Sequence, residues 1–317
     1  MILTLGETLI DMIVSHGDHL SLKPIPGGSP FNTAIALSRL DVPVGFMGNV
    51  SRDPLGNLIL EQLISNGVDT RYLHLVENPS TLALVHPDEA GEAQYGFYID
   101  GTAAASFSPA DIPPQLPECV RALVFGSIAL VMEPLGSTLE EFLHRERTGR
   151  LLSFDPNVRP ALMNSFPDYF SRYERILSLS TIVKLSQEDL HYLYPSQKEE
   201  EVIHGILSQG PRLIIVTRGE KGASAFKRTA SGIDRVDVPS VPTPIVDTVG
   251  AGDTFHGAFL AWLAHHDVLT EEKVGMLSEG DIFEALLFAS RAASLVCTRA
   301  GADPPTLVEL HMGERNT

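Results

Sequence analysis

The sequence contains few cysteines, few aromatic residues and little positive charge. Among 317 residues there are two cysteines and one tryptophan, and 23 Lys and Arg stand against 40 Asp and Glu, for a net charge of −17. Two cysteines allow at most one disulfide and no Cys/His metal cluster, which favours a reducing compartment. The acidity argues against nucleic acid and anionic membranes as partners. A phosphate-bearing ligand stays open, because such sites are built locally.

Long apolar runs and leader-like segments are also missing. No window reaches the ~18 uninterrupted apolar residues of a membrane-spanning helix, and no basic segment with a cleavage site opens the chain. An apolar share of 44% is enough for a sizeable core. We therefore expect a cytoplasmic globular protein that is neither exported nor membrane-spanning. Without linkers or repeats, residues 1–317 are expected to form one domain.

Short apolar runs alternate with segments of helical period, which indicates an α/β fold. Strands are predicted at 2–5, 44–48, 122–125, 151–154, 182–185 and 213–217. Helices are predicted at 32–40, 54–66, 135–147, 199–208, 253–266 and 282–297. This alternation favours a mostly parallel central sheet covered by helices on both faces.

Two stretches depart from this alternation. Residues 81–86 and 94–99 flank turn-forming residues at 88–91, which is typical of a β-hairpin. Residues 12–15 and 22–25 could add shorter strands to it. We predict a small β-sheet lid formed by about residues 12–26 and 81–100, because lids exclude water from reactions that water would spoil.

A loop of small residues is the most informative segment. Gly250, Ala251 and Gly252 lead directly into an apolar helix. Backbone N–H groups point outward at a helix N-terminus, so this loop could hold an anion that Asp253 would face. Alternatively, Asp253 caps the helix and the glycines make a tight turn. No Lys-Ser or Lys-Thr follows, and Phe255 replaces a third glycine, so the P-loop and the dinucleotide fingerprint do not fit.

Other predicted strand ends carry polar residues. Gly27 and Gly28 precede a helix with Asn32 near its start, and they could contact a small ligand or simply form a turn and a cap. Parallel sheets bind ligands at the carboxyl ends of their strands. Asp11, near the first strand, could thus accept hydrogen bonds from hydroxyl groups or stand solvated in a loop. Arg159 could donate a forked pair of hydrogen bonds or form a surface salt bridge.

Positive charge gathers in one stretch near residue 220. Between Pro211 and Arg228 five basic residues accompany one acidic residue, Glu220. In a chain of net charge −17 this stretch could bind a polyanion. Solvated charges on a strand–turn–strand surface explain it equally well.

Together these segments resemble the ribokinase-like carbohydrate kinases, the phosphofructokinase B family. The resemblance covers nearly the whole chain and is most specific in its last segment. It rests on residues 6–11, 27–28, 155–159, 217–223 and 247–253. The first and third of these segments look closest to the fructokinases.

The resemblance implies a role for each candidate residue. It makes Asp253 the catalytic base, with an anion hole formed by Gly250, Ala251 and Gly252. The residues implied to bind the sugar are Asp11, Gly27, Gly28, Asn32 and Arg159. Those implied to bind the nucleotide are Ser186, Thr217, Gly219 and Gly222, and Asp189 is implied at the metal site.

The resemblance also implies an activity. The first-ranked reading is an ATP-dependent sugar kinase that phosphorylates a primary hydroxyl, converting D-fructose to fructose 6-phosphate. ATP and Mg²⁺ are the implied cofactors, K⁺ is a candidate activator, and a homodimer through the lid is expected. A kinase of the same fold for 2-keto-3-deoxygluconate, ribose or a nucleoside is the second reading. A non-catalytic sugar- or nucleotide-binding relative is the third, against which the intact Asp253 argues.

The sequence departs from the family pattern in three places. Ser186 and Asp189 stand where the family often has Asn and Glu. No Arg follows Tyr98, although fructokinases commonly carry one in the lid. Residues 301–305 replace the segment that completes a monovalent-cation loop in relatives.

Overall fold

A nine-stranded sheet forms the centre of the computed structural model, which describes residues 1–16, 20–87, 93–229 and 232–314. Its strands are β1 (Ile2–Leu5), β4 (Val44–Ser51), β5 (Asp69–Val76), β8 (Ala122–Gly126), β9 (Leu151–Asp155), β10 (Ile182–Ser186), β11 (Leu213–Thr217), β12 (Ala223–Thr229) and β13 (Gly232–Val238). They lie in the order β13-β12-β11-β10-β9-β8-β1-β4-β5. Neighbours are parallel except the antiparallel pairs β11–β12 and β12–β13. The carboxyl ends of the parallel strands therefore meet at one edge.

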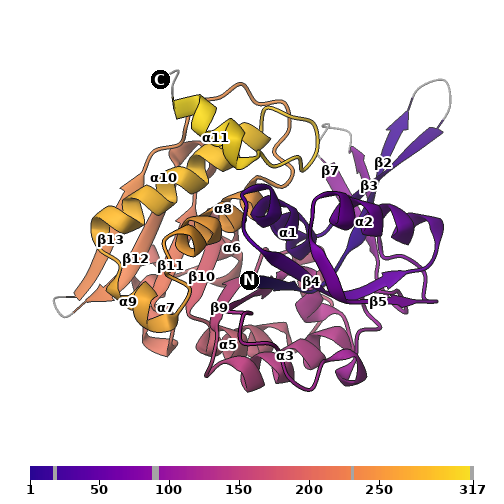
Figure 1. The fold of residues 1–317 in the computed structure, drawn as a ribbon, viewed down its shortest axis with the longest axis horizontal. Coiled ribbons are helices and arrows are strands. Elements are labelled where there is room, and N and C mark those ends of the chain that lie inside the picture. The colour runs from indigo at the N-terminus through magenta and orange to yellow at the C-terminus, as the bar shows by residue number, and fades with distance from the viewer. Residues whose placement is uncertain (17–19, 88–92, 230–231, 315–317) are drawn as a thin grey trace.

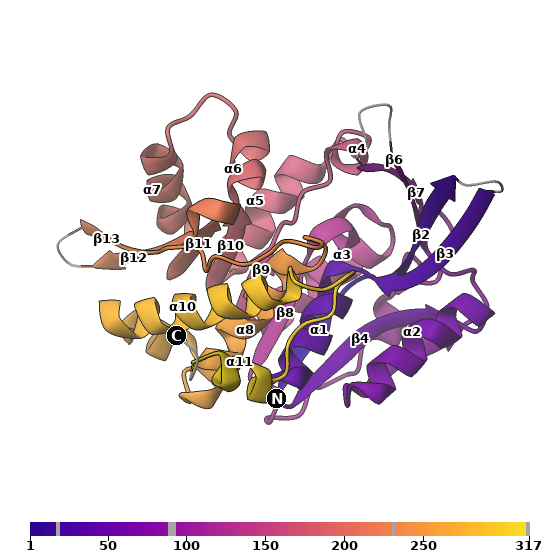
Figure 2. The same cartoon turned by 90° about the horizontal axis from the view of Figure 1, so that it is seen from above.

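Helices cover both faces of this sheet, as Figures 1 and 2 show. One face carries α1 (Ser29–Arg39), α2 (Pro54–Ser65), α8 (Ala251–His265), α9 (Glu271–Met276), α10 (Glu279–Val296) and α11 (Leu307–Glu314). The other carries α3 (Leu135–Glu146), α4 (Pro160–Met163), α5 (Tyr169–Leu179), α6 (Gln187–Leu193) and α7 (Glu199–Gln209). Along β11, Leu213 and Ile215 join one core while Ile214 and Val216 join the other, as the period of two requires. The predicted architecture is confirmed. Within the described ranges, no helix is long and apolar enough to cross a membrane.

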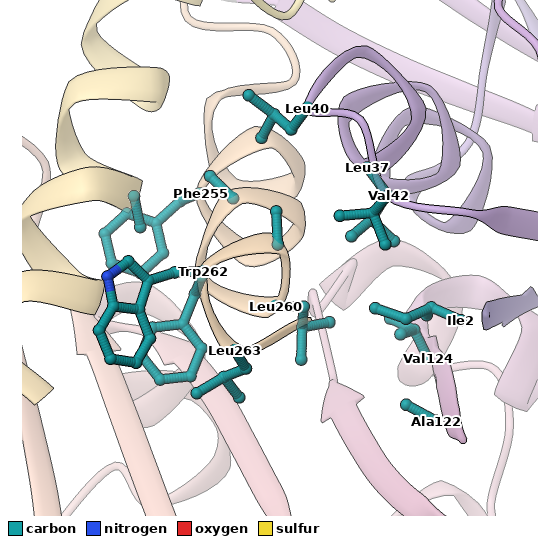
Figure 3. Packing of buried hydrophobic residues seen from close by; sticks show 14 of the residues in the cluster. Ile2, Leu37, Leu40, Val42, Ala122, Val124, Phe255, Leu260, Trp262 and Leu263 are labelled. Carbon is teal, nitrogen blue, oxygen red and sulfur yellow. The ribbon is translucent and has the colours of Figure 1, made fainter. Parts of the chain in front are cut away.

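Helix α8 lies inside the protein and is buried on every side from Asp253 to Leu263. Leu260 and Leu263 point toward the sheet, and Phe255 and Trp262 pack beneath the neighbouring helix (Figure 3). Burial of each such side chain stabilises the fold by ~1.5–3 kcal/mol. The packing fixes the N-terminus of α8 at the carboxyl edge of the sheet.

A small four-stranded sheet projects from one end of the body (Figures 1 and 2). Its strands are β2 (Leu9–His16), β3 (Leu20–Gly27), β6 (Leu82–Pro87) and β7 (Ala93–Tyr98), in the order β3-β2-β6-β7. The strands of the predicted hairpin are confirmed, and β2 and β3 are longer than predicted. The turn predicted at 88–91 lies outside the described residues.

Two helices begin three residues earlier than predicted, and α8 begins at Ala251 rather than residue 253. Helix α1 starts at Ser29 rather than residue 32, because Pro30 is tolerated in a first turn, where no intrahelical N–H bond is lost. Helix α10 starts at Glu279 rather than residue 282. There Ser278 and Asp281 form a capping box, in which each side chain accepts the other's backbone N–H.

Candidate active site

A polar cavity of about 280 Å³ opens at the carboxyl edge of the large sheet. Most residues predicted to bind the sugar or to react with it line this cavity: Asp11, Gly28, Asn32, Arg159, Gly250, Gly252 and Asp253. Leu9 of β2 and Phe97 of β7 also line it, so the small sheet forms one wall. Gly27 lies beside it, since a Cβ there would stand 2.6 Å from Asp11 Oδ2. Distant segments of the chain thus converge as predicted.

A second cavity of about 620 Å³ lies on the other side of the α8 N-terminus. Three residues predicted for the nucleotide, Thr217, Gly219 and Gly222, line it, as does Ala251. Its remaining walls are largely apolar: Val241, Pro242, Ile245, Phe255, Ala293 and Cys297. Thr248 and Gly252 line both cavities. A ligand in the larger cavity can therefore reach the smaller one past the loop of small residues.

The turn into α8 depends on Gly250. This residue is the N-cap and adopts φ 75°, in the left-handed region that glycine enters without strain. A Cβ at this position would lie 2.5 Å from Ala302 Cβ, so a larger residue does not fit. The helix begins at Ala251, whose N–H donates to the carbonyl of Thr248, and the N–H groups of Gly252 and Asp253 follow at the junction of the cavities.

Asp253 is not the cap of α8. It lies in the first turn, and its carboxylate accepts hydrogen bonds from Ser29 Oγ at 2.6 Å, Asn32 Nδ2 at 2.8 Å and Asn157 Nδ2 at 3.3 Å. It is 7% exposed, and burial raises its pKa above the ordinary value, while the hydrogen bonds from Ser29 and Asn32 oppose the rise. The alternative of a plain helix cap is wrong.

Asn157 connects several groups of the site. Its φ of 39° is left-handed, a conformation that Asn tolerates better than most residues. Its Nδ2 donates to Asp253, and its Oδ1 accepts from Arg159 Nη1 at 2.7 Å. Strained backbone of this kind concentrates at functional sites. Ser127, which also lines the polar cavity, has φ 57°.

Two further carboxylates share the polar cavity with Asp253. Burial raises the pKa of Asp11 to about 6, although Arg159 opposes the rise. Burial likewise raises the pKa of Glu7 to about 7, against hydrogen bonds that favour its ionised form. Glu7 Oε1 and Oε2 accept the backbone N–H groups of Ser29 and Ala129 at 3.3 and 3.2 Å. Such closely spaced acceptors suit a ligand rich in hydroxyl groups.

Several residues of this site were not assigned by the sequence: Glu7, Ser29, Asn157 and Ser127. Glu7 and Asn157 lay inside motifs that were recognised, and their placement after strand ends was the available signal. Ser29 follows the Gly27–Gly28 pair in the same way. Ser127 also follows a predicted strand end, at residue 125, but its left-handed backbone conformation has no signal in the sequence.

Ser186 and Asp189 lie in neither of the two cavities. They form the capping box of α6: Ser186 Oγ accepts from the N–H of Asp189, and Asp189 Oδ2 accepts from the N–H of Ser186 at 2.7 Å. Asp189 Oδ1 accepts the N–H of Val158, also at 2.7 Å. Their roles toward nucleotide and metal stay predictions. Within the described residues no group of three or more His, Cys, Asp or Glu is arranged to hold a metal ion.

The basic residues near 220 do not converge on one ligand. Arg212 pairs with Glu271, and Arg218 pairs with Glu199. Lys227 donates to the carbonyl of Leu277. These three side chains contact neighbouring elements of the structure, and two of them form ion pairs, which favours a surface of paired charges over a polyanion site made by the basic side chains.

Comparison with known proteins agrees with this geometry. Residues 1–308 match the pfkB family carbohydrate kinases. The chain is 39% identical to the fructokinase of Rhizobium leguminosarum bv. trifolii over 282 residues, which covers 88% of this chain and 84% of that protein. The structure resembles that of a fructokinase with bound ATP from Xylella fastidiosa, with a TM-score of 0.90 at 26% identity, covering 100% of this chain and 99% of the other. It also resembles a fructokinase of Vibrio cholerae O395 bound to fructose, ADP and calcium, with a TM-score of 0.83 at 27% identity and 98% coverage of both chains.

The chain belongs to the pfkB family of carbohydrate kinases, with a ribokinase-like fold. It is therefore a phosphotransferase that acts on an alcohol group.

Proposed function

We propose that this carbohydrate kinase transfers the γ-phosphoryl group of ATP to the primary hydroxyl at C6 of D-fructose. The observation that carries the proposal is the meeting of two unlike cavities at the N-terminus of α8, where Asp253 faces the polar one. The resemblance to fructokinases in sequence and in structure supports fructose as the acceptor.

In this proposal the polar cavity holds the sugar. Asp11 accepts hydrogen bonds from sugar hydroxyl groups, and Asn32 and Asn157 hold the carboxylate of Asp253 toward the reacting hydroxyl. The apolar cavity takes the adenine ring, since apolar walls bury an aromatic ring without leaving polar groups unpaired. The nucleotide phosphates then pass Gly252 toward the sugar.

Phosphoryl transfer requires positioning and stabilisation of charge more than covalent help from the protein. As the sugar oxygen bonds to phosphorus and the bond to ADP breaks, Asp253 accepts the proton of the hydroxyl. This transfer occurs late, because a free alcohol is a far weaker acid than a carboxylic acid. The N–H groups of residues 250–253 stabilise the charge on the transferring group. Burial makes Asp253 a stronger base than a solvated aspartate.

Magnesium fits this site as a companion of the nucleotide. Mg²⁺ is ordinarily held by substrate phosphates, water and one or two carboxylates rather than by a cage of protein ligands. The lack of a clustered set of ligands among the described residues agrees with that mode. Both carboxylate oxygens of Asp189 accept backbone N–H groups, so we propose Asp189 as an acidic residue near the ion rather than as its direct ligand. The ion would neutralise phosphate charge.

We also propose that the small sheet acts as a lid over the sugar and as the contact of a homodimer. Leu9 and Phe97 line the polar cavity, and movement of this sheet would open or close it. Leu22 and Tyr98 of the same sheet are 49% and 61% exposed, which suits a contact with a second copy. Sedimentation of the wild type against Tyr98→Glu would test this, because an added charge should dissociate a dimer and should not affect a monomer.

Substrate choice is tested by ADP release with a panel of acceptors. Purified protein with ATP and Mg²⁺ should show its highest kcat/KM on D-fructose among D-fructose, 2-keto-3-deoxygluconate, ribose and adenosine. A preference for the sugar acid that Arg159→Ala abolishes would replace fructose with that acceptor, since Arg159 lines the cavity and could bind a carboxylate. No release with any acceptor would contradict the proposal.

A further inference from the structure

Two buried charged residues lie beneath the anion hole and have no role in the phosphoryl transfer proposed above. Lys184, in β10, and Asp155, at the end of β9, are 4% and 3% exposed. Lys184 Nζ stands 2.7 Å from Asp155 Oδ2. Placing both charges in the interior is costly, so a pair of this kind calls for an explanation beyond stability.

The ammonium group of Lys184 lies against the N-terminus of α8. A Cβ added to Gly252 would meet Lys184 Nζ at 3.1 Å. Because Gly252 has no side chain, the ammonium group of Lys184 can lie close to it, beside the N–H groups that form the proposed anion hole. A full positive charge thus adds to the partial positive charge of the helix terminus.

The ammonium keeps spare hydrogen-bonding capacity. In the described part of the chain, Asp155 is the hydrogen-bond partner of Nζ, which has three N–H donors. Burial acts to lower the pKa of Lys184, but the charges of Asp155, Asp189 and Asp253 outweigh it and raise the pKa. The group is therefore charged at neutral pH.

Asp155 connects this charge with the catalytic base. Its Oδ1 accepts the backbone N–H of Asn157 at 3.1 Å and so supports the left-handed conformation of that residue. Asn157 Nδ2 in turn contacts Asp253. His256, 4.0 Å from Asp155, carries no charge, because burial and the nearby Lys184 lower its pKa to about 3.

We propose that Lys184 is a positioning residue for phosphoryl transfer: held by Asp155, it places a fixed positive charge at the anion hole and favours ionised Asp253. The inference rests on the proposed kinase function. Charges that are preorganised in a water-poor site stabilise developing negative charge without reorganising during the reaction.

The test compares Lys184→Met with Lys184→Arg. Loss of the charge should lower kcat by roughly 10²-fold, the cost of removing one donor from an oxyanion hole, with little change in KM for fructose or ATP. Lys184→Arg keeps the charge and should retain more of kcat than Lys184→Met. A kcat of Lys184→Met equal to that of the wild type would overturn the proposal.

The pH profile provides a readout that a purely structural role would not move. The charged groups around Asp253 are Glu7, Asp11, Asp155, Lys184 and, in the wall of the same cavity, Arg159. Lys184 is the cation whose charge lowers the pKa of the buried Asp253, so Lys184→Met should shift the acidic limb of kcat to higher pH. Arg172→Met is the matched control. It removes a buried cation, 5% exposed, whose partners are Glu133 and Glu140, and it should lower the melting temperature without moving that limb.

Two further measurements distinguish a failure of the Lys184 proposal from misfolding of the variant and from failure of the proposed kinase function. Lys184→Met/Asp155→Asn removes the whole charge pair, leaves no buried charge unpaired and keeps the acceptor for Asn157, so it should fold and still be slow. If this double variant recovers the parent kcat, the charge is not needed and the proposal fails. Wild-type protein that releases no ADP with fructose and ATP contradicts the proposed function instead.

Discussion

The two cavities beside α8 differ in the side chains that line them. The smaller has three carboxylates, one guanidinium and two Asn side chains in its walls. The surface of the larger is mostly apolar, with Val, Pro, Ile, Phe and Ala among its lining residues, and Glu220 is its charged lining residue. A polar wall recognises hydroxyl groups through directional hydrogen bonds, and an apolar wall binds an aromatic ring by burying its apolar surface. Our proposal that one cavity takes the sugar and the other the base of the nucleotide rests on this difference. Asp253 and Gly252 lie where the two meet.

The largest expected effect on kcat comes from a change at Asp253, where the two cavities meet. Asp253→Asn should lower kcat by ~10²–10⁴-fold, because a positioned general base is lost while the shape and two hydrogen bonds can persist. Binding of fructose and ATP, measured by calorimetry, should change little, and circular dichroism should match that of the parent. A folded variant that turns over at close to the parent rate would return Asp253 to a structural role.

A change confined to the polar cavity should affect one substrate only. Asp11→Ala removes a charged acceptor of sugar hydrogen bonds, worth ~1.5–3 kcal/mol. The fructose KM should therefore rise by about one to two orders of magnitude while the ATP KM stays near that of the parent. Equal increases in both constants would place Asp11 outside the sugar site.

The reciprocal change fills the apolar cavity. Ala293 of α10 lines it, and Ala293→Trp should raise the ATP KM about tenfold, since overfilling a packed site costs ~1–3 kcal/mol. The fructose KM should not change. Ala293→Ser, nearly equal in volume to the parent residue, serves as the control and should bind ATP normally. An increase confined to fructose would reverse the assignment of the two cavities.

The smallest effect is a pH dependence restricted to the sugar. Asp11 has a pKa raised to about 6 by burial, so lowering the pH through that value protonates it and removes an acceptor. The fructose KM should rise about fourfold between pH 7.5 and 5.5, as the ionised fraction falls. Asp11→Asn, measured in the same buffers, should lose this part of the dependence. If its profile parallels that of the wild type, Asp11 is not the titrating group.

Much of the fold followed from local sequence pattern. The alternation of apolar runs and helical periods gave six strands of the large sheet and both strands of the predicted hairpin, because each depends on neighbouring residues. Strand β5 was not predicted: its residues are mostly half-exposed and include Arg71 and His74, so it lacks the apolar run of a buried strand. Helix α5 was also absent from the prediction, although Tyr169 and Tyr173 in it are buried.

Local sequence pattern likewise predicted some residues of the site and missed others. Gly250 and Asp253 were found because their spacing is itself a motif. The pair Lys184 and Asp155 was not, since 29 residues separate its members and a lysine in a strand ordinarily indicates solvent exposure. Only the parallel pairing of β9 with β10 brings the two side chains together. Contacts between strands depend on register, which composition and periodicity do not specify.

The central claim is that the sugar and nucleotide cavities meet at Asp253, the proposed catalytic base. The identity of the product tests this claim most directly. Wild-type protein incubated with ATP, Mg²⁺ and D-fructose should give a single phosphomonoester by phosphorus NMR, coupled to the protons on C6, and Asp253→Asn should give almost none in the same time. Phosphate on C1, or equal product from the variant, would contradict the account.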